Sequence, residues 1–368
     1  MKILFVVTED WYFVSHRLPL AVAALAAGYE VAVATHEGQH GEIIRRSGIR
    51  LIPFELSRRS GNTLREVIAL WRLYRREKFD LVHHVALKAV MVGALAAWLA
   101  RVPAQVNAVT GLGWLFTSSG RTVRLVRPAL RWVLARLLNQ PHSLTIVQNP
   151  EDMALLEHSG VSAARMRLIR GAGVDIQLFY PVTPPSEPVC IVLIARMLWD
   201  KGVGEFIEAA RCLTGAGVSA RFVLVGAFDP ANPASVPEST LHSWHGQHGV
   251  EWWGRREDIS SVLQSAHIAC LPSYREGSPK SLLEAAACGL PIVTTDAPGC
   301  REIVRDGVNG LLVPVRDVAA LAAALKKLID DAALRRSMGE QSRVLAETEF
   351  GQETVIAKTL AVYREACV

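Results

Sequence analysis

The sequence predicts an α/β protein built from two doubly wound, Rossmann-like domains that face a central cleft. Short apolar runs of strand length alternate with longer helical segments, which is typical of parallel sheets. A Pro-rich stretch, residues 174–188, interrupts the alternation, which then begins again. The chain has 368 residues and half of them are apolar, so each domain has enough apolar surface for a core.

The domain boundaries follow from this alternation. We expect an N-terminal domain over residues 1–173, a linker over 174–188, a C-terminal domain over 189–345, and a last segment over 346–368 that packs back toward the N-terminal domain. In sheets of this kind, ligands bind beyond the carboxyl ends of the strands. Two domains that face each other would therefore bring two sets of loops to one cleft.

The first domain opens with a strand–helix–strand unit. The apolar run 2–7 predicts a buried strand and residues 30–35 predict the next one. Residues 16–29 predict the helix between them, ending near Gly28. Because a helix joins the two strands, we expect them to be parallel. Further strands are expected at residues 49–54, 81–85, 104–110 and 143–149.

The second domain repeats the pattern. Strands are expected at residues 189–196, 220–227, 250–254, 267–273, 291–295 and 310–315, and helices at 202–217, 280–289, 317–330 and 354–366. For the helix that begins near residue 280, Ser278 is a suitable N-cap and Pro279 suits the first helical position, because its missing N–H would have been unpaired anyway.

Charge is unevenly distributed along the chain. Residues 1–180 carry 22 basic and 13 acidic residues, whereas residues 181–368 carry 18 and 22. No acidic residue occurs between Asp80 and Glu151, a span that holds seven Lys and Arg. A basic first half indicates an anionic partner, and nucleic acid, lipid headgroups and a phosphorylated substrate all fit this charge pattern.

Several classes of protein are disfavoured. The N-terminus predicts no signal peptide, because Glu9 and Asp10 follow a short apolar run. The longest weakly polar stretch, residues 89–100, is shorter than the ~20 residues that span a bilayer. The six cysteines have no CxxC spacing, which favours reduced thiols. No Asp-x-Asp pair occurs, so we expect no metal ion. We expect no cofactor either.

Two carboxylates stand on either side of a predicted helix start. Glu276 lies in the loop before the helix and Glu284 lies inside it, with seven residues between them. A helix N-terminus offers free N–H groups and partial positive charge, which suit a phosphate. Lys280 in the first turn is unfavourable there unless an anion binds nearby. The alternative, a surface loop with a helix-capping Glu, remains open.

Two further cations follow the first strand of the second domain. Arg196 and Lys201 lie five residues apart in a loop expected at the carboxyl edge of the sheet. Together they could clamp a diphosphate. A solvated pair of surface charges is the alternative.

Residues 118–138 predict a basic amphipathic helix. Its arginines recur at intervals of three and four beside an aromatic anchor: Arg121, Arg124, Arg127, Arg131 and Trp132. This pattern is typical of helices that lie on a membrane surface. An ordinary amphipathic helix packed on its sheet would look similar.

Two short motifs give weaker evidence of a ligand site. His36, Glu37 and His40 form an HExxH pattern, but it directly follows a strand and contains a glycine, so we interpret it as a polar loop and not as a zinc site. Gly111 and Gly113 lack the third glycine of GxGxxG, and the first strand–helix turn has none, which disfavours a dinucleotide-binding dehydrogenase. The glycine pair predicts either a tight turn or close approach to a ligand.

Taken together, these features resemble retaining glycosyltransferases of the GT-B fold, in the large group (group 1, family four) that carries an E-x7-E motif. The resemblance covers nearly the whole chain and is carried by "EGSPKSLLEAAACGLPIVTTDAPGCREIVRDGVNGLLVPVRD", "IARMLWDKG", "GVDIQLFYP" and "LPSYREG". It implies a nucleotide-sugar-binding C-terminal domain and an acceptor-binding N-terminal domain.

The resemblance also implies roles for individual residues. Glu284 would bind the ribose hydroxyls, Glu276 would contact the transferred sugar, and Arg196 and Lys201 would hold the diphosphate. The remaining nucleotide-sugar contacts would come from Gly254, Gly277, Ser278, Lys280 and Ser281. Many relatives have glycine where this chain has Pro279; since proline has no N–H to donate, Lys280 would replace that contact.

The segments "FVSHRLP" and "TGLGWLF" resemble bacterial members that extend undecaprenyl-diphosphate-linked sugars. This resemblance implies a UDP-sugar donor of a hexose or N-acetylhexosamine, with UDP-GalNAc or a related donor favoured, and a lipid-diphosphate-linked acceptor in surface-glycan or glycoprotein-glycan assembly. The acceptor side would use His16, Arg17, Gly111 and Gly113. Nucleic acid is then not expected as a partner, and the enzyme would be cytoplasmic and peripheral, on the inner face of the plasma membrane.

The family is thought to use front-face displacement, in which the leaving diphosphate takes the acceptor's proton, cations stabilise its charge and the anomeric configuration is retained. Three alternatives remain open. The acceptor could be soluble. The chain could instead be a glycoside hydrolase that uses Glu276 and Glu284 as acid and nucleophile, which requires carboxyls about 5–5.5 Å apart in a retaining enzyme. It could also be a non-catalytic protein that binds nucleotide sugars.

Overall fold

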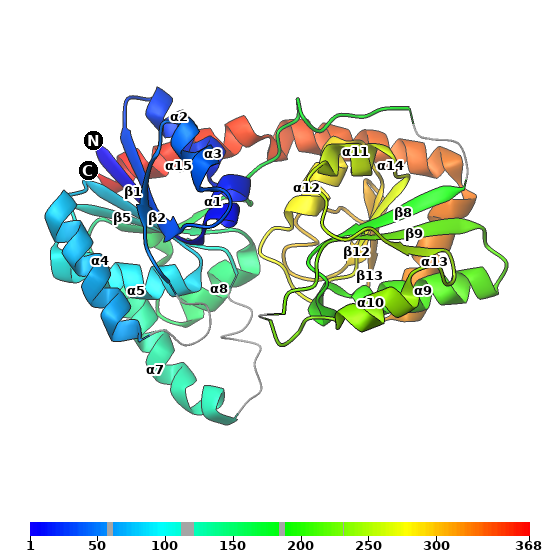
Figure 1. Cartoon of the computed structure of the whole chain (residues 1–368), viewed down its shortest axis with the longest axis horizontal. Coiled ribbons are helices and arrows are strands. Elements are labelled where there is room, and N and C mark those ends of the chain that lie inside the picture. The colour runs from blue at the N-terminus through cyan, green and yellow to red at the C-terminus, as the bar shows by residue number, and fades with distance from the viewer. Residues whose placement is uncertain (57–61, 112–120, 184–187, 231) are drawn as a thin grey trace. The chain divides into compact units, whose positions relative to one another are not determined.

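The computed structural model describes residues 1–56, 62–111, 121–183, 188–230 and 232–368, and within residues 121–127 the backbone alone. The chain divides into two compact units, one formed by Met1–Ala172 with Glu353–Val368 and one by Gly173–Gln352. Each unit is a parallel sheet with helices on both faces (Figure 1). The predicted fold class of two doubly wound α/β domains is therefore confirmed.

The sheet of the first unit has seven described strands in the order β3-β2-β1-β4-β5-β6-β7, and neighbouring strands are parallel. Their bounds are β1 Lys2–Glu9, β2 Glu30–His36, β3 Arg50–Pro53, β4 Leu81–Val85, β5 Ala104–Val109, β6 Ser143–Val147 and β7 Met166–Leu168. Each predicted strand is present, and the short β7 is an addition. The order reverses between β1 and β4, so the topological switch point of this unit lies there.

Helices cover both faces of this sheet. They are α1 Asp10–His16, α2 Leu18–Ala26, α3 Gly41–Arg46, α4 Thr63–Glu77, α5 Leu87–Ala100, α7 Arg121–Leu138, α8 Pro150–His158, the 3-10 turn η1 Ala163–Arg165, and α15 Gln352–Ala366. Helices α1, α2, α3 and α15 pack on one face around Phe5 and Tyr363, while α4 and α5 pack on the other around Leu70 and Val82 (Figure 1).

The start of the first unit differs from the prediction. A loop was expected between β1 and a helix over residues 16–29, but residues 10–16 already form α1 and a break at Arg17 separates it from α2. The side chain of the buried Asp10 explains the early start, because it accepts the N–H groups of Gly38 at 2.7 Å and His40 at 2.8 Å and so fixes the first turn against the next loop. All of α2 lies within the predicted range.

The sheet of the second unit has six described strands in the order β10-β9-β8-β11-β12-β13, and neighbouring strands are again parallel. Their bounds are β8 Val189–Ile194, β9 Ala220–Val225, β10 Val250–Trp252, β11 Ile268–Leu271, β12 Ile292–Thr295 and β13 Gly310–Val313. All six were predicted. The switch point of this unit lies between β8 and β11.

The helical segments of the second unit are the 3-10 turn η2 Trp199–Lys201, α9 Val203–Gly215, α10 Glu238–Trp244, α11 Ile259–Gln264, α12 Lys280–Ala287, α13 Val318–Asp330, α14 Ala332–Leu345 and the π-helical turn η3 Ala346–Phe350. One core layer gathers α9, α10, α13 and α14, and the other gathers α11, α12 and η3.

The segment expected as a linker is part of the second unit as far as it is described. The N–H of Val174 donates to the carbonyl of Phe350 at 2.9 Å, and Val174 and Phe179 are both buried in a core of that unit. These two apolar side chains anchor the start of the segment in that core. Residues 353–368, in contrast, belong to the first unit.

Candidate active site

Two of the residues predicted to bind a nucleotide sugar lie in loops at the carboxyl edge of the second sheet. The loop after β8 carries Lys201, and the loop after β11 carries Glu276. These two strands flank the switch point, where the connections diverge to opposite sides and leave room for a ligand. The topology therefore brings together residues that are 75 positions apart in the chain.

Lys201 and Glu276 form an ion pair at this point. The Nζ atom of Lys201 lies 2.5 Å from Oε1 of Glu276. Both side chains are largely buried, with 17% and 13% of their surface exposed. A partly desolvated pair of this kind interacts more strongly than one on an open surface.

A glycine fixes the loop that carries Lys201. Gly202 has φ of +72°, and a Cβ atom at this position would lie 2.1 Å from the carbonyl oxygen of Pro272. The two loops are also hydrogen-bonded, because the Asp200 carbonyl accepts the Tyr274 N–H at 2.9 Å and the Ser273 hydroxyl at 3.1 Å. Only glycine combines this close approach with a left-handed backbone.

A second glycine supports Glu276 from behind. A Cβ atom on Gly299, which has φ of +82°, would lie 2.5 Å from the carbonyl oxygen of Glu276. The N–H of Glu276 donates to the Pro298 carbonyl at 3.0 Å. Cys300 lies beneath this loop, where burial and, next, the charge of Glu276 raise the pKa of its thiol to about 12. These contacts were not found from the sequence, although glycines at loop ends were the available signal.

Helix α12 lies within the predicted range 280–289, but its N-cap is not the predicted residue. Pro279 has the extended angles φ −71° and ψ 111° and is itself the N-cap, so Lys280 is the first helical residue. The Ser278 hydroxyl is buried and has no hydrogen-bond partner among the described residues. The prediction of Ser278 as the cap was wrong, because a cap side chain must come from the residue directly before the helix.

Glu284 lies inside α12 and is 6% exposed. Its Oε1 lies 3.1 Å from Nζ of Lys280, one turn earlier. Burial raises the pKa of Glu284, and the charge and hydrogen bond of Lys280 oppose that rise. The predicted pair of carboxylates is thus accompanied by a pair of lysines, one on each carboxylate.

Arg196 is engaged elsewhere in this structure. Its Nη1 lies 2.9 Å from Oδ2 of Asp229, and about half of its side chain is exposed. Gly254 has φ of +66°, and its carbonyl accepts the N–H of Gly226 at 2.8 Å. The structure therefore brings Lys201, Glu276, Lys280 and Glu284 into two ion pairs around the start of α12, and holds Arg196 on a separate carboxylate.

Two small residues complete the predicted nucleotide-sugar set. Gly277 follows Glu276, and its carbonyl would lie 2.8 Å from a Cβ atom on Gly299. Ser281 lies in the first turn of α12 and is partly exposed. Both therefore lie at the same helix start as the two ion pairs.

The expected acceptor-side residues belong to the first unit. His16 ends α1, and its ring stacks on Tyr12 with centroids 4.2 Å apart. Arg17 is buried between α1 and α2. Gly111 has φ of +152°, with open space where a Cβ would be. Gly113 and the side chains of Arg121, Arg124 and Arg127 lie outside the described residues.

In the structure, residues of the HExxH pattern contact separate neighbours. His36 contacts Glu55 at 3.0 Å, and Glu37 contacts Arg45 at 2.6 Å. Within the residues that the structure describes, no cluster of three or more His, Cys, Asp or Glu is arranged to hold a metal ion. His40 directly precedes α3, where its backbone N–H donates to Asp10.

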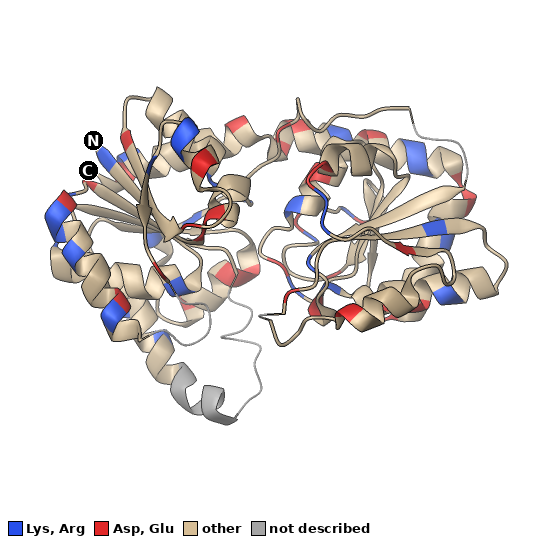
Figure 2. Ribbon diagram, viewed as in Figure 1, with Lys and Arg blue, Asp and Glu red and all other residues tan. Residues whose placement is uncertain are grey.

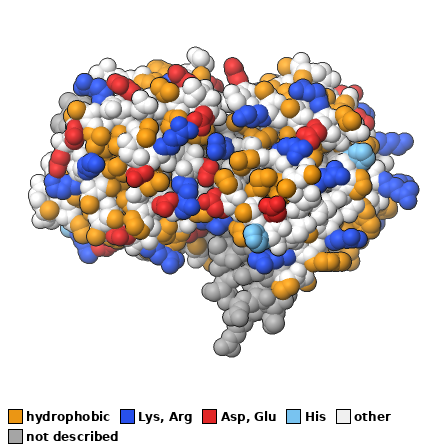
Figure 3. All heavy atoms as spheres, turned by 180° about the vertical axis from the view of Figure 1, so that it is seen from behind, with side chains coloured by type: hydrophobic (Ala, Val, Ile, Leu, Met, Phe, Trp, Pro, Cys, Tyr) orange, Lys and Arg blue, Asp and Glu red, His pale blue; other side chains and the backbone are white. Residues whose placement is uncertain are grey.

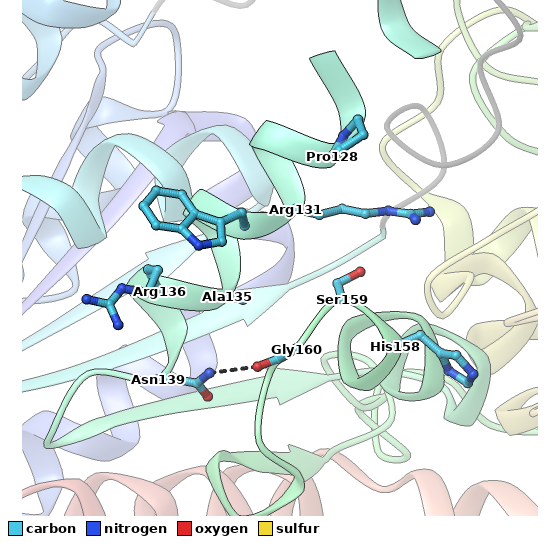
Figure 4. A pocket seen from close by; sticks show the side chains of 9 residues that line it. Pro128, Arg131, Ala135, Arg136, Asn139, His158, Ser159 and Gly160 are labelled. Atoms are coloured by element: carbon cyan, nitrogen blue, oxygen red, sulfur yellow. Dashed lines mark hydrogen bonds between the residues drawn. The ribbon is translucent and has the colours of Figure 1, made fainter. Parts of the chain in front are cut away.

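The second half of α7 borders a surface pocket of about 420 Å³. It is lined by Arg131, Trp132, Arg136, Asn139 and His158, among others. Figure 4 shows Arg131 and Arg136 pointing away from opposite sides of the helix, while Asn139 donates to the Gly160 carbonyl at 2.8 Å. Trp132 is 66% exposed. Among the described residues, no helix has both the length and the apolar composition needed to cross a bilayer.

Comparison with known proteins places both units among glycosyltransferases. Residues 188–331 match the family described as glycosyl transferases group 1, and residues 2–139 match the family described as glycosyl transferase 4-like. The E-x7-E segment and its two ion pairs lie within the first of these ranges.

Two curated relatives are similar over most of the chain. The N,N'-diacetylbacillosaminyl-diphospho-undecaprenol alpha-1,3-N-acetylgalactosaminyltransferase of Campylobacter jejuni is 29% identical over 94% of both chains. The UDP-Gal:alpha-D-GlcNAc-diphosphoundecaprenol alpha-1,3-galactosyltransferase of Escherichia coli is 26% identical over 74% of this chain and 72% of that one. Among solved structures, Anabaena HepE in complex with UDP and glucose superposes with a TM-score of 0.79 at 22% identity, covering 98% and 99% of the chains.

We predict that Gly202→Ala lowers the free energy of unfolding by more than about 2 kcal/mol, because the new methyl group meets the Pro272 carbonyl and the backbone is left-handed. Gly215→Ala is the matched control: it lies in α9, no atom is within 4 Å of its Cβ position, and its φ is not in the left-handed range. Urea unfolding checks both variants. Equal stability of the two would contradict the assigned contact.

Proposed function

This chain belongs to the group 1 and 4-like glycosyl transferases, and from that premise we propose that it moves a hexose or an N-acetylhexosamine from a UDP-sugar to an undecaprenyl-diphosphate-linked sugar, with retention at the anomeric carbon. UDP-GalNAc or a related donor is our first choice. The observation that carries the proposal is the pair of carboxylate–lysine contacts around the start of α12. The names of the two curated relatives support the lipid-linked acceptor.

The unliganded site neutralises its own charges, which suits a diphosphate donor. Lys201 is held by Glu276 and Lys280 is held by Glu284. An arriving diphosphate would compete for the lysines and draw them from the carboxylates. Glu276 and Glu284 would then be free to accept hydrogen bonds from sugar and ribose hydroxyls.

The proposed reaction needs no protein nucleophile. The acceptor hydroxyl oxygen forms a bond to the anomeric carbon while the bond from that carbon to the diphosphate oxygen breaks. The hydroxyl proton passes to the leaving diphosphate, and UDP departs. Lys201, Lys280 and the first turn of α12 would stabilise the developing negative charge, since preformed positive groups around a leaving group lower its barrier.

The hydrolase alternative is less well supported. A retaining hydrolase needs one carboxyl free to act as a nucleophile. Here Glu276 and Glu284 each contact a lysine, and a neutral glycan gives those lysines no charge to bind. The family membership of both units favours transfer as well.

We expect the protein to release UDP from a UDP-sugar only when an acceptor with a lipid-linked diphosphate is present. A coupled UDP assay with a panel of donors and a short-chain prenyl-diphosphate sugar measures this. Release without acceptor would favour hydrolysis, and nucleotide-sugar binding without release would favour a non-catalytic protein.

We also infer that the transfer activity persists after exhaustive chelation, because lysines take the place of a metal cation. A loss of activity that magnesium or manganese restores would contradict metal independence.

The pKa of Glu284 gives a second prediction. Because that pKa is raised, the folded protein holds the proton more tightly than the unfolded chain does, so the ionised carboxylate lowers stability as pH rises through the folded pKa. We expect unliganded Glu284→Gln to melt at a higher temperature than the wild type at pH 7–8, with the difference shrinking toward pH ~4. Calorimetry should also show UDP binding weakened roughly tenfold to a hundredfold.

The control for this pair of measurements is Glu257→Gln. The Glu257 side chain is 86% exposed in the same unit, so we expect neither effect there. Unchanged UDP binding by Glu284→Gln would rule out its role as a ribose ligand. A lower melting temperature at neutral pH would mean that the Lys280 pair outweighs the cost of burial.

We also propose that the first unit attaches reversibly to an anionic membrane surface, where a lipid-linked acceptor resides. On α7, Trp132 is exposed and Arg131 and Arg136 flank it. On α4, Leu64, Ile68 and Trp71 are exposed at a helical spacing, with 68%, 37% and 37% exposure.

Cations accompany the apolar face of α4. Arg72 and Arg75 are exposed on this helix, and Figure 2 shows basic residues along it. The opposite view mixes charges of both signs with apolar side chains (Figure 3), so the side chains in that view form no purely basic surface. Aromatic anchors beside arginines are typical of interfacial helices. We therefore place the proposed attachment on the α4 and α7 layer.

We expect sedimentation with liposomes that contain anionic lipid, weaker at high salt because ions screen the attraction. An Arg124→Glu, Arg127→Glu, Arg131→Glu variant tests α7, and an Arg72→Glu, Arg75→Glu variant tests α4. Either should bind less than the wild type. If the wild type ignores anionic liposomes, or if both variants bind as well as it does, the attachment fails and a soluble acceptor becomes the better assignment.

A further inference from the structure

Arg17 is an anomaly of the first unit. The residue is 5% exposed, and its Nε is buried without a hydrogen-bond partner in the part of the chain that the structure describes. The ion pairs found among the described residues do not include it. A guanidinium needs acceptors for its N–H groups, and a buried positive charge without a negative partner is strongly unfavourable. Something absent from the protein alone would satisfy it.

The groups around Arg17 do not supply a negative charge. His83 on β4 is fully buried, and its Nδ1 lies 2.5 Å from the Tyr363 hydroxyl. The other ring nitrogen, Nε2, is buried and has no partner among the described residues. Burial, then the charge of Arg17 and then that of His84, lowers the pKa of His83, so this imidazole is neutral near pH 7. Burial raises the pKa of Tyr363, which keeps its hydroxyl protonated.

The cluster involves one of the two strands that flank the switch point of the first sheet. Arg17 follows β1 by way of α1, and His83 lies on β4, the strand beside β1 at the switch point of the first sheet. Ligands of doubly wound sheets bind outside the strand ends at this point. Arg17 is also the N-cap of the nine-residue helix α2, whose partial positive charge adds to its own.

These observations point to one class of ligand. A group that carries negative charge and several acceptor oxygens would pair with Arg17 and accept a hydrogen bond from its buried Nε–H. A phosphate or diphosphate has both properties, whereas a neutral sugar lacks the charge. The second unit already carries the lysines proposed for the donor, so the anion at the first unit belongs to the other substrate.

We propose that Arg17, with His83 beside it, forms an oxyanion site that holds the diphosphate of the lipid-linked acceptor. The identity of the ligand rests on the proposed function. The existence of an anion site does not, because it follows from a buried cation without a partner in the described chain. Arg17 would then select acceptors by their diphosphate, independently of the sugar they carry.

The first experiment uses inorganic pyrophosphate on the full chain with UDP at saturation, so that the nucleotide site is occupied. We expect pyrophosphate to raise the melting temperature of the wild type and not that of Arg17→Gln. Without any anion, Arg17→Gln should melt higher than the wild type, because it removes a buried, unpaired charge. A purely structural arginine would give the opposite sign.

Arg46→Gln is the matched control. Arg46 is a surface arginine of the same unit, 79% exposed and paired with Glu42, so its loss should leave the pyrophosphate response unchanged. If Arg17→Gln does not fold, Arg17→Lys keeps the charge but loses the forked donors, and we expect it to bind pyrophosphate at least tenfold more weakly. Pyrophosphate binding by Arg17→Lys or Arg17→Gln equal to that of the wild type would overturn the site.

The second experiment identifies the ligand. With a short-chain prenyl-diphosphate sugar as acceptor, Arg17→Gln should raise the acceptor KM at least tenfold and leave the donor KM unchanged. An unchanged acceptor KM would overturn the assignment to the acceptor. If the wild type transfers sugar to no diphosphate-linked acceptor, the proposed function fails, and the pyrophosphate response by itself decides whether the anion site exists.

Discussion

The chemistry of the second unit depends on a backbone contact that leaves no room for a side chain. Gly202 approaches the carbonyl of Pro272 so closely that even a methyl group would overlap it. This contact joins the loop after β8 to the loop after β11, and two hydrogen bonds to the Asp200 carbonyl reinforce it. Lys201 is therefore placed against Glu276 by the backbone, and the ion pair is a consequence of that packing.

The two units differ in whether their buried or partly buried cations have a negatively charged partner. At the switch point of the second unit, each lysine is paired with a carboxylate, Lys201 with Glu276 and Lys280 with Glu284, so the charges of the site balance within the protein. In the first unit, the buried cation Arg17 has no such partner among the described residues. Neutral His83 and Tyr363 beside it add polarity without compensating charge.

Much of the fold and part of the site could be predicted from the sequence. Apolar strand runs and the restart of the pattern after residue 188 predicted the two parallel sheets, since β-strands and crossover helices leave strong periodic signals. Glu276 and Glu284 were predicted at the ligand-binding edge because their loop follows a strand, and Lys201 was predicted there with Arg196 for the same reason. Two predictions were wrong. Ser278 is not the cap of α12, because the cap depends on local backbone angles. The first helix begins earlier than expected, because a long-range contact of the Asp10 side chain fixes its first turn.

The sequence by itself determined the architecture, the order of the elements and the residue types available for the chemistry, because these depend on local periodicity and composition. Only the tertiary structure decided which charges meet. It paired Lys201 with Glu276 and held Arg196 on Asp229, although the two cations are five residues apart. It also buried Arg17 beside His83, which lies on β4 and comes 66 residues later in the chain. The physical reason is that parallel strands place distant loops at one edge, and their close packing there fixes each partner.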